Sequence, residues 1–303
     1  MVYTALAGEL RSLVKGTVKT DEPMSKHTTW RIGGKADLFV DPGDKEDIRR
    51  VVEFVRTRDI PLTVIGNGSN LLVKDGGIRG VVLKVGRGLA EISVQGTTIK
   101  AGAGAMLPEL AAAARRAGLG GFEFAAGIPG SLGGGIVMNA GAVNGCVANV
   151  LHSVEVINEH NRFVTLHNKE LGFQYRTSNL QGKQVICVSA LWQGYAKSKA
   201  LIEQETRDYL LKRKAAQPQG YPNAGSVFKN PAGDYAGRLI EACGGKGLRV
   251  GDAQVSTKHA NWILNLGRAT ARDVLTLIEK IKKMVQEAFG IELHLEVRVL
   301  GED

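Results

Sequence analysis

Two glycine-rich loops in the chain are suited to binding an anion through backbone N–H groups. The first follows a short apolar run and reads Gly66-Asn67-Gly68-Ser69-Asn70. It begins like a dinucleotide-binding fingerprint, but Leu71 stands at the third glycine position and a strand, not a helix, is predicted to follow. The loop is therefore not a Rossmann turn. Its backbone can still surround a diphosphate, although a tight hairpin without a ligand explains this segment equally well.

The second loop is denser in glycine, with ten glycines between positions 118 and 145. It contains the run Ala125-Ala126-Gly127-Ile128-Pro129-Gly130-Ser131-Leu132-Gly133-Gly134-Gly135, followed by Asn139-Ala140-Gly141-Ala142. Glycine loses more entropy on folding than any other residue, so this cluster indicates a backbone that passes close to something flat or charged. Close packing of two chain segments is the alternative. A P-loop nucleotide hydrolase is excluded, because no Gly-x-x-x-x-Gly-Lys-Ser/Thr sequence is present.

Net charge indicates which ligands such loops would meet. The formal charge is +9, which favours anionic partners. Lys and Arg are scattered along the chain and aromatic residues make up only 6%, so the basic and aromatic stretch of a nucleic-acid-binding protein is missing. Phosphorylated small molecules are the leading class of partner, and we expect no nucleic acid.

The same sequence also indicates location and metal content. The first residues lack the basic region and apolar core of a signal peptide, and no stretch approaches the ~20 apolar residues of a membrane span. We therefore expect a cytoplasmic protein without a membrane partner, either a monomer or a weak homo-oligomer. Cys146, Cys187 and Cys243 are far apart and have no metal-binding spacing, so neither disulfides nor a metal site is expected.

The elements that would position the loops form mixed α/β units. Apolar periodicity predicts strands at 36–40, 61–65, 80–85, 97–101, 153–157, 162–166, 184–192 and 261–266. Helices are predicted at 44–58, 108–117, 197–216, 235–242 and 270–289, the last with Thr270 as N-cap and Gly290 after its end. A closing strand at 291–299 would place Glu296 on its polar face.

Several motifs together resemble the UDP-N-acetylenolpyruvoylglucosamine reductase family. Ile65 to Val73, Ala126 to Gly134 and the segment Trp30-Arg31-Ile32-Gly33-Gly34-Lys35-Ala36-Asp37 resemble its flavin region. Tyr175-Arg176-Thr177-Ser178, Ala224-Gly225-Ser226-Val227-Phe228-Lys229-Asn230-Pro231 and Leu295-Glu296-Val297-Arg298 resemble its three catalytic motifs, in the family order. The resemblance spans roughly residues 20 to 300.

The resemblance implies an α+β fold with a two-part FAD-binding domain of the p-cresol methylhydroxylase and vanillyl-alcohol oxidase type, followed by a smaller C-terminal α+β substrate domain. By this analogy, residues 1–85 form the first FAD-binding subdomain, 86–200 the second and 201–295 the substrate domain. Residues 296–303 would return to the first subdomain. The chain resembles the subtype that lacks an extra substrate-capping loop with its tyrosine.

The same resemblance implies a noncovalently bound FAD along both glycine loops. The cofactor-binding residues it indicates are Gly66, Asn67, Gly68, Ser69, Asn70, Gly127, Pro129, Gly130, Ser131, Gly133, Gly134, Asn139 and Gly141.

The implied reaction uses NADPH to reduce the enolpyruvyl ether of UDP-N-acetylglucosamine enolpyruvate, a step in making peptidoglycan precursors. A hydride goes from the flavin to the β-carbon, and Ser226 gives a proton to the α-carbon. Arg176 and Glu296 would stabilise the enolate-like intermediate, Arg176 because a guanidinium is permanently cationic and forked. Substrate contacts are expected from Tyr175, Lys214, Lys229 and Asn230.

Two other functions compete with this interpretation. A sugar or alcohol oxidase of the same FAD-domain superfamily would keep the flavin and pass electrons to oxygen, but the motif around Ser226 argues against it. A basic module without catalysis would use the glycine loops to bind phosphates of RNA or of a nucleotide, and such a protein would be colourless.

Overall fold

A computed structural model describes residues 2–142 and 145–303 and divides them between two compact units. Unit 1 comprises residues up to Thr20, Leu38–Asn67 and Gly80–Arg213, and unit 2 comprises Asp21–Asp37, Gly68–Arg79 and Lys214–Asp303. Each unit has its own apolar core. The predicted assignment of cofactor and substrate roles to three parts of the chain stays a prediction, because compactness does not reveal what a segment binds.

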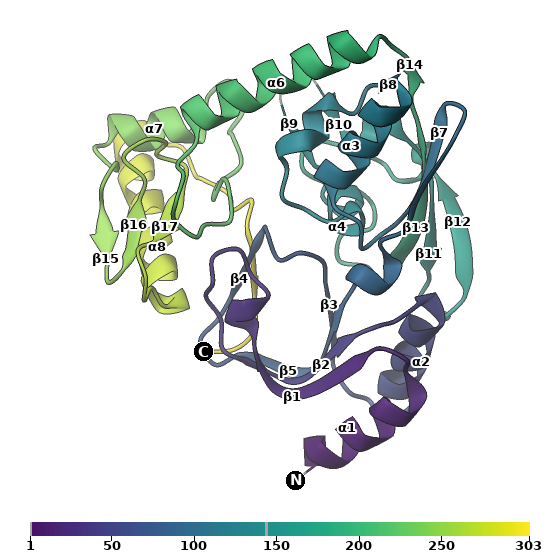
Figure 1. The fold of residues 1–303 in the computed structure, drawn as a ribbon. Coiled ribbons are helices and arrows are strands. Elements are labelled where there is room, and N and C mark those ends of the chain that lie inside the picture. Colours follow the sequence, from purple (N-terminus) through teal and green to yellow (C-terminus); the bar gives the residue numbers. More distant parts are fainter. Residues whose placement is uncertain (1, 143–144) are drawn as a thin grey trace. The chain divides into compact units, whose positions relative to one another are not determined.

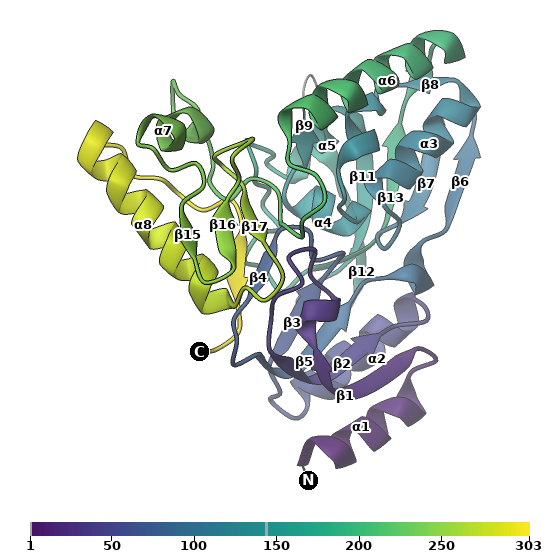
Figure 2. The same cartoon turned by 60° about the vertical axis from the view of Figure 1, so that its left-hand side comes forward.

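The largest sheet lies in unit 1 and is antiparallel throughout. Its strands, in sheet order, are β12 (Phe163–His167), β11 (Leu151–Ile157), β13 (Ile186–Gln193), β7 (Thr98–Gly102) and β6 (Ile92–Gln95). On β11, Val154 pairs with Leu166 of β12 on one side and with Ala190 of β13 on the other. Helices α3 (Leu107–Ala117) and α4 (Leu132–Val137) pack against this sheet (Figure 2).

A second sheet has the strand order β1-β2-β5-β3, with β3 parallel to β5. The strands are β1 (Thr17–Pro23), β2 (Lys35–Asp41), β5 (Ile78–Lys84) and β3 (Leu62–Ile65). Helix α2 (Lys45–Arg56) has the predicted amphipathic pattern, burying Ile48, Val51 and Phe54, and packs against α1 (Val2–Leu13).

The further elements up to residue 216 are short, apart from the 18-residue helix α6. They are η1 (Met24–Lys26), η2 (Arg87–Leu89), β8 (Leu119–Gly120), η3 (Glu123–Gly127), β9 (Gly141–Ala142), β10 (Gly145–Cys146), α5 (Val147–Val150), η4 (Asn168–Glu170), β14 (Tyr195–Ala196) and α6 (Lys199–Ala216).

Unit 2 is assembled from three segments that are distant in sequence. Its elements are β4 (Leu71–Val73), α7 (Ala236–Ala242), β15 (Arg249–Val250), β16 (Ala253–Val255), β17 (Ile263–Asn265), α8 (Ala271–Phe289) and β18 (Arg298–Leu300). Helix α8 lies along the small sheet β15-β16-β17 (Figure 1), and β18 pairs in parallel with β4.

Trp30 links the first of these segments to the last. Its side chain is fully buried, and the indole N–H donates to the carbonyl of Ile263 over 2.8 Å. The Asn265 amide donates in return to the Trp30 carbonyl over 3.0 Å. Because buried polar groups are costly unless they are bonded, these contacts fix the N-terminal segment on the core of unit 2.

The ends of α8 agree with the sequence prediction, whereas the strand after it does not. The Thr270 hydroxyl accepts the N–H of Asp273, and Gly290 ends the helix in the left-handed conformation at φ 68°. The predicted strand 291–299 is wrong in extent, since only Arg298–Leu300 forms a strand. Residues 291–297 have just one isolated bridge, from Leu295 to Phe228, so no continuous partner strand is available there.

Two further findings concern the predictions made from composition. Within the described ranges, none of the helices is both long and apolar enough to cross a membrane. All three cysteines are free thiols, and burial raises the pKa of Cys187 to about 12.

Asp47 is a buried carboxylate on which the start of unit 1 depends, and its removal should destabilise the protein. It accepts the backbone N–H groups of Lys15, Gly16 and Gly43 at 2.8–3.1 Å. Asp47→Ala leaves these donors without their acceptor, at a cost of about 1–3 kcal/mol each where they are shielded from water. We expect the free energy of unfolding in urea to fall by about 3 kcal/mol.

Glu46→Ala is the matched control, because Glu46 is half-exposed and pairs with Arg49 across one helical turn. Its loss should cost no more than ~0.5 kcal/mol. An Asp47→Ala variant as stable as the control would contradict this account.

Candidate functional site

The two glycine loops approach one another within unit 1. A Cβ on Gly66 would lie 2.2 Å from Oγ of Ser131, so no larger residue fits there without moving the second loop. Asn67 donates its side-chain N–H to the carbonyl of Pro129 over 2.7 Å. The two loops that the sequence predicts to hold one diphosphate are therefore in contact. If the first loop were merely a tight hairpin, no such contact would be needed.

The three consecutive glycines of α4 have different surroundings. A Cβ on Gly133 would lie 3.1 Å from the Cβ of Ala103, and one on Gly135 would lie 3.1 Å from a methyl group of Leu107. These two glycines allow the helix to pack on its neighbours. Gly134 is exposed, and a Cβ there would meet only Oγ of Ser131, at an ordinary 3.4 Å. Packing within the described chain does not explain why Gly134 is a glycine, whereas a ligand on that surface would.

The other predicted cofactor residues of the second loop are used partly in the protein's own packing. Gly127 lies under the side chain of Arg213 on α6, whose Cδ would be 2.8 Å from a Cβ. The Gly130 carbonyl accepts the N–H of Leu107 over 2.9 Å. Gly141 pairs with Cys146 between β9 and β10.

Residues 68–70 of the first loop belong to unit 2. Gly68 adopts φ 68° and packs against the backbone of His27, and Ser69 is half-buried. Asn70 donates its side-chain amide to the carbonyl of Glu296 over 3.0 Å, and its own carbonyl accepts the N–H of Arg298 over 2.9 Å. The end of the first loop is thus bonded to the third of the predicted catalytic motifs.

Ser226 and Glu296, both predicted to be catalytic, lie on adjoining segments of unit 2. The carbonyl of Val227 accepts the N–H of Glu296 over 2.8 Å, and Lys229 donates its N–H to the carbonyl of His294 over 2.9 Å. Both side chains are half-buried. The structure therefore brings together two motifs that are far apart in the sequence.

Asn261 was not predicted, yet it fixes the segment that carries Ser226. Its side chain accepts the N–H of Phe228 over 2.9 Å and donates to the carbonyl of the same residue over 2.8 Å. Its backbone carbonyl accepts the N–H of Val227 over 2.9 Å. In the sequence, the only signal for this role was an asparagine in the apolar stretch of the predicted strand 261–266. In the structure, Asn261 is 3% exposed.

Nearby polar residues have structural contacts of their own. Asn230 accepts the N–H of Ala236 through its side-chain oxygen over 3.1 Å, which leaves its amide N–H₂ as the group for a ligand. The Ser256 hydroxyl accepts the N–H groups of Lys258 and His259, and burial lowers the pKa of His259. Lys214 is exposed, and its carbonyl accepts the Lys258 ammonium over 2.7 Å.

Arg176 is the third predicted catalytic residue and lies in unit 1, at a tight turn. Gln174 and Thr177 exchange two backbone hydrogen bonds around Tyr175 and Arg176. Arg176 has φ 56°, a conformation that few non-glycine residues adopt. Its guanidinium lies 5.1 Å from the centre of the Tyr175 ring, and Tyr175 is 55% exposed.

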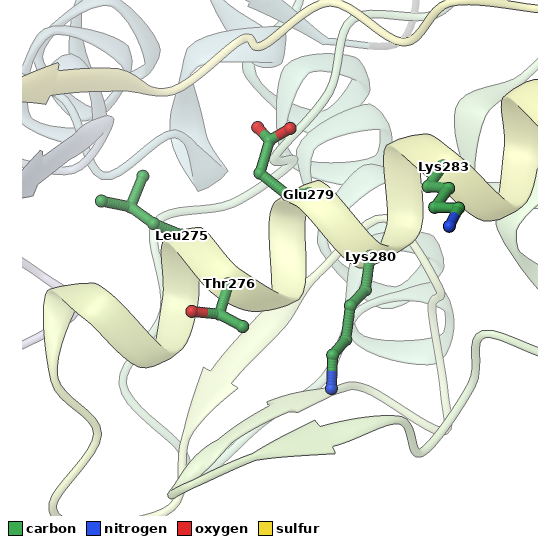
Figure 3. Close-up of a pocket in the computed structure, with 5 residues that line it drawn as sticks. All are labelled: Leu275, Thr276, Glu279, Lys280 and Lys283. Carbon is green, nitrogen blue, oxygen red and sulfur yellow. The ribbon is translucent and has the colours of Figure 1, made fainter.

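A groove on α8 contains none of these residues. It is lined by Leu275, Thr276, Glu279, Lys280 and Lys283, all on one helix (Figure 3). Side chains of a single exposed helix enclose little of a ligand's surface, so this groove is not the candidate site.

Two family models match successive stretches of the chain. Residues 36–167 match the family model described as FAD binding domain, and residues 217–300 match the one described as UDP-N-acetylenolpyruvoylglucosamine reductase, C-terminal domain. These matches confirm the predicted FAD cofactor and the predicted α+β fold, an FAD-binding domain followed by a smaller C-terminal domain.

Curated relatives and a solved structure match over almost their full length. UDP-N-acetylenolpyruvoylglucosamine reductase of Desulforamulus reducens is 72% identical over 100% of both chains. That of Moorella thermoacetica is 47% identical over 100% of this chain and 99% of its own. The crystal structure of UDP-N-acetylenolpyruvylglucosamine reductase from Thermus caldophilus is similar with a TM-score of 0.82 and 37% identity, covering 95% of this chain and 99% of that one.

Gly134 allows the ligand and packing explanations of the glycine cluster to be separated. Gly134→Ala should leave the free energy of unfolding of the FAD-free protein unchanged or slightly higher, because alanine is favoured over glycine in a helix by up to ~1 kcal/mol. If backbone at this surface lies against FAD, the added methyl group should weaken FAD binding by at least an order of magnitude. Flavin fluorescence quenching measures this affinity.

Gly8→Ala is the control, since Gly8 also lies in a helix and a Cβ there meets nothing within 4 Å. Unchanged FAD affinity in Gly134→Ala would favour the packing explanation.

Proposed function

The chain belongs to the UDP-N-acetylenolpyruvoylglucosamine reductase family, and from this premise we propose that it reduces UDP-N-acetylglucosamine enolpyruvate to UDP-N-acetylmuramate, with NADPH as the source of the hydride. This reaction supplies a peptidoglycan precursor. The observation that carries the proposal is the adjoining position of the Ser226 and Glu296 segments, joined by the bond from the Glu296 N–H to the Val227 carbonyl.

FAD fits the residues present, because Gly134 is exposed and leaves the space that a Cβ would fill. Bound FAD supplies the chemistry of accepting a hydride from NADPH and passing it to the substrate. The chain's own part at this stage is to hold the cofactor: the backbone of both glycine loops would bind the diphosphate, and the Asn67 bond to Pro129 keeps the two loops together.

Arg176 and Glu296 act on the enolpyruvyl group. When a hydride reaches the β-carbon, its electron pair forms the new C–H bond and the former double-bond pair moves to the α-carbon and its carboxylate. Arg176 holds this carboxylate, since a guanidinium stays cationic as the negative charge grows. Glu296 donates a hydrogen bond to the same group, which requires its carboxyl to carry or share a proton. The Asn70 bond to the Glu296 carbonyl fixes the backbone of this residue.

Ser226 completes the reaction by giving its hydroxyl proton to the α-carbon. A serine hydroxyl is a weak acid, but the enolate-like intermediate is a strong base, so the transfer is favourable. Protonation of the α-carbon gives the saturated ether as product, and the serine then regains a proton from solvent. Tyr175, Lys214, Lys229 and Asn230 are proposed to bind the UDP-sugar, with the Lys229 ammonium and the Asn230 amide as donors to phosphate or carboxylate oxygens.

Ser226→Ala tests the proposal, because it should affect one half of the reaction only. Reduction of bound FAD by NADPH should run at the wild-type rate. Reoxidation of the reduced flavin by UDP-N-acetylglucosamine enolpyruvate should slow by about 10²- to 10⁴-fold, the usual contribution of a general acid. Anaerobic stopped-flow absorbance measures both steps.

Ser93→Ala, which removes an exposed hydroxyl from β6, should change neither rate. The proposal fails if Ser226→Ala is reoxidised by the substrate as fast as the wild type, or if the wild type is not reoxidised by it at all.

A further inference from the structure

The turn that carries Arg176 is held by hydrogen bonds from Gln181, a residue outside the predicted motifs. Gln181 lies five residues further along the chain, and its amide N–H₂ group donates to the Arg176 carbonyl over 3.0 Å. The same group donates to the Val137 carbonyl over 3.2 Å and contacts Sδ of Met138 at 3.4 Å. One amide thus connects the turn to the end of α4, the helix of the glycine loop.

Two neighbouring side chains strengthen this connection. The Ser178 hydroxyl donates to the Val137 carbonyl over 2.7 Å. The Asn139 amide donates to the Gln174 carbonyl over 2.9 Å, and its oxygen accepts the N–H of Ala148 over 3.0 Å. Asn139 is only 7% exposed and has φ 44°, so both ends of its amide are engaged inside unit 1.

The backbone conformation of Arg176 explains why these hydrogen bonds matter. A residue such as arginine rarely adopts a positive φ, and it keeps one only where its surroundings over-determine the backbone. Two backbone hydrogen bonds between Gln174 and Thr177 close the turn, but neither of them involves the carbonyl of Arg176. Gln181 bonds to that carbonyl, and so it fixes the peptide plane that sets the direction of the Arg176 side chain.

We propose that Gln181 is a positioning residue for Arg176. Asn139 supports the same turn from its other end, through its bond to the Gln174 carbonyl. Gln181 does not touch the substrate. It aligns the guanidinium with the substrate carboxylate by coupling the turn to the helix of the glycine loop, and hence to the cofactor. This inference rests on the proposed function, in which Arg176 stabilises the growing negative charge.

The proposal predicts a loss confined to the substrate half of the reaction. Gln181→Met keeps the length of the side chain and removes both N–H donors. Reoxidation of reduced flavin by UDP-N-acetylglucosamine enolpyruvate should slow on the order of 10²-fold, the usual effect of a small misplacement of a catalytic group. FAD affinity and flavin reduction by NADPH should stay at wild-type values.

Gln181→Met has a matched control and a second variant that tests the same step. Asn179→Ala removes an exposed side chain from the same loop, whose amide donates to the Glu170 carbonyl over 3.3 Å, and should leave every rate unchanged. Gln181→Glu keeps size and polarity but places a carboxylate against two carbonyl oxygens, so it should slow the same step. It provides the measurement if Gln181→Met does not fold.

A double-mutant cycle separates positioning from any independent role, because a residue that acts through Arg176 adds nothing once Arg176 is absent. Arg176→Ala combined with Gln181→Met should be reoxidised at the rate of Arg176→Ala alone. Additive losses would overturn the proposal, and so would a wild-type rate in Gln181→Met beside a slow Arg176→Ala. If Arg176→Ala itself is fast, the role of Arg176 in the proposed function fails as well, which makes the two failures distinguishable.

Discussion

Antiparallel contact between residues 226–229 and 294–297 is the constraint on which the proposed chemistry of unit 2 depends. Its backbone bonds place Ser226 and Glu296 on neighbouring segments. Asn261 supports it from one side through three bonds to Val227 and Phe228, and Asn70 supports it from the other. All these donors and acceptors are amides, which are costly to bury unpaired. The segments therefore have one low-energy alignment, and a site that must deliver a proton to one carbon atom requires such an alignment.

Glycine serves two distinct needs in the cofactor region. Gly133 and Gly135 let α4 approach Ala103 and Leu107, and Gly66 lets the first loop reach Ser131. These close approaches concern packing and make the loops rigid. Gly134 faces outward with room for a methyl group, so its lack of a side chain is best explained by a ligand. A glycine-rich loop in such a protein is thus both a packed element and a binding surface, and the two functions fall on alternate residues.

Local patterns in the sequence predicted the elements that local forces determine. Helix α8 begins and ends where Thr270 and Gly290 indicate, because a cap bonds to its own helix. The strand expected at 291–299 is mostly irregular, because its apolar alternation reflects burial of Leu293 and Val297 rather than pairing. The core shared by Trp30 and residues 214–303 depends on contacts between distant segments, which periodicity does not reveal. Likewise, the predicted site lacked Asn261 and Gln181, which lie outside the motifs and matter because they bond to backbone groups of residues within them.

An anaerobic spectral titration of the FAD-bound protein tests the proposed reaction as a whole. We expect NADPH to bleach the flavin absorption and UDP-N-acetylglucosamine enolpyruvate then to restore it without oxygen, with one equivalent of substrate consumed per flavin. A protein that is bleached by NADPH and regains its colour only when oxygen is admitted would contradict the assigned substrate while keeping the flavin. A protein that binds no flavin would contradict the account as a whole.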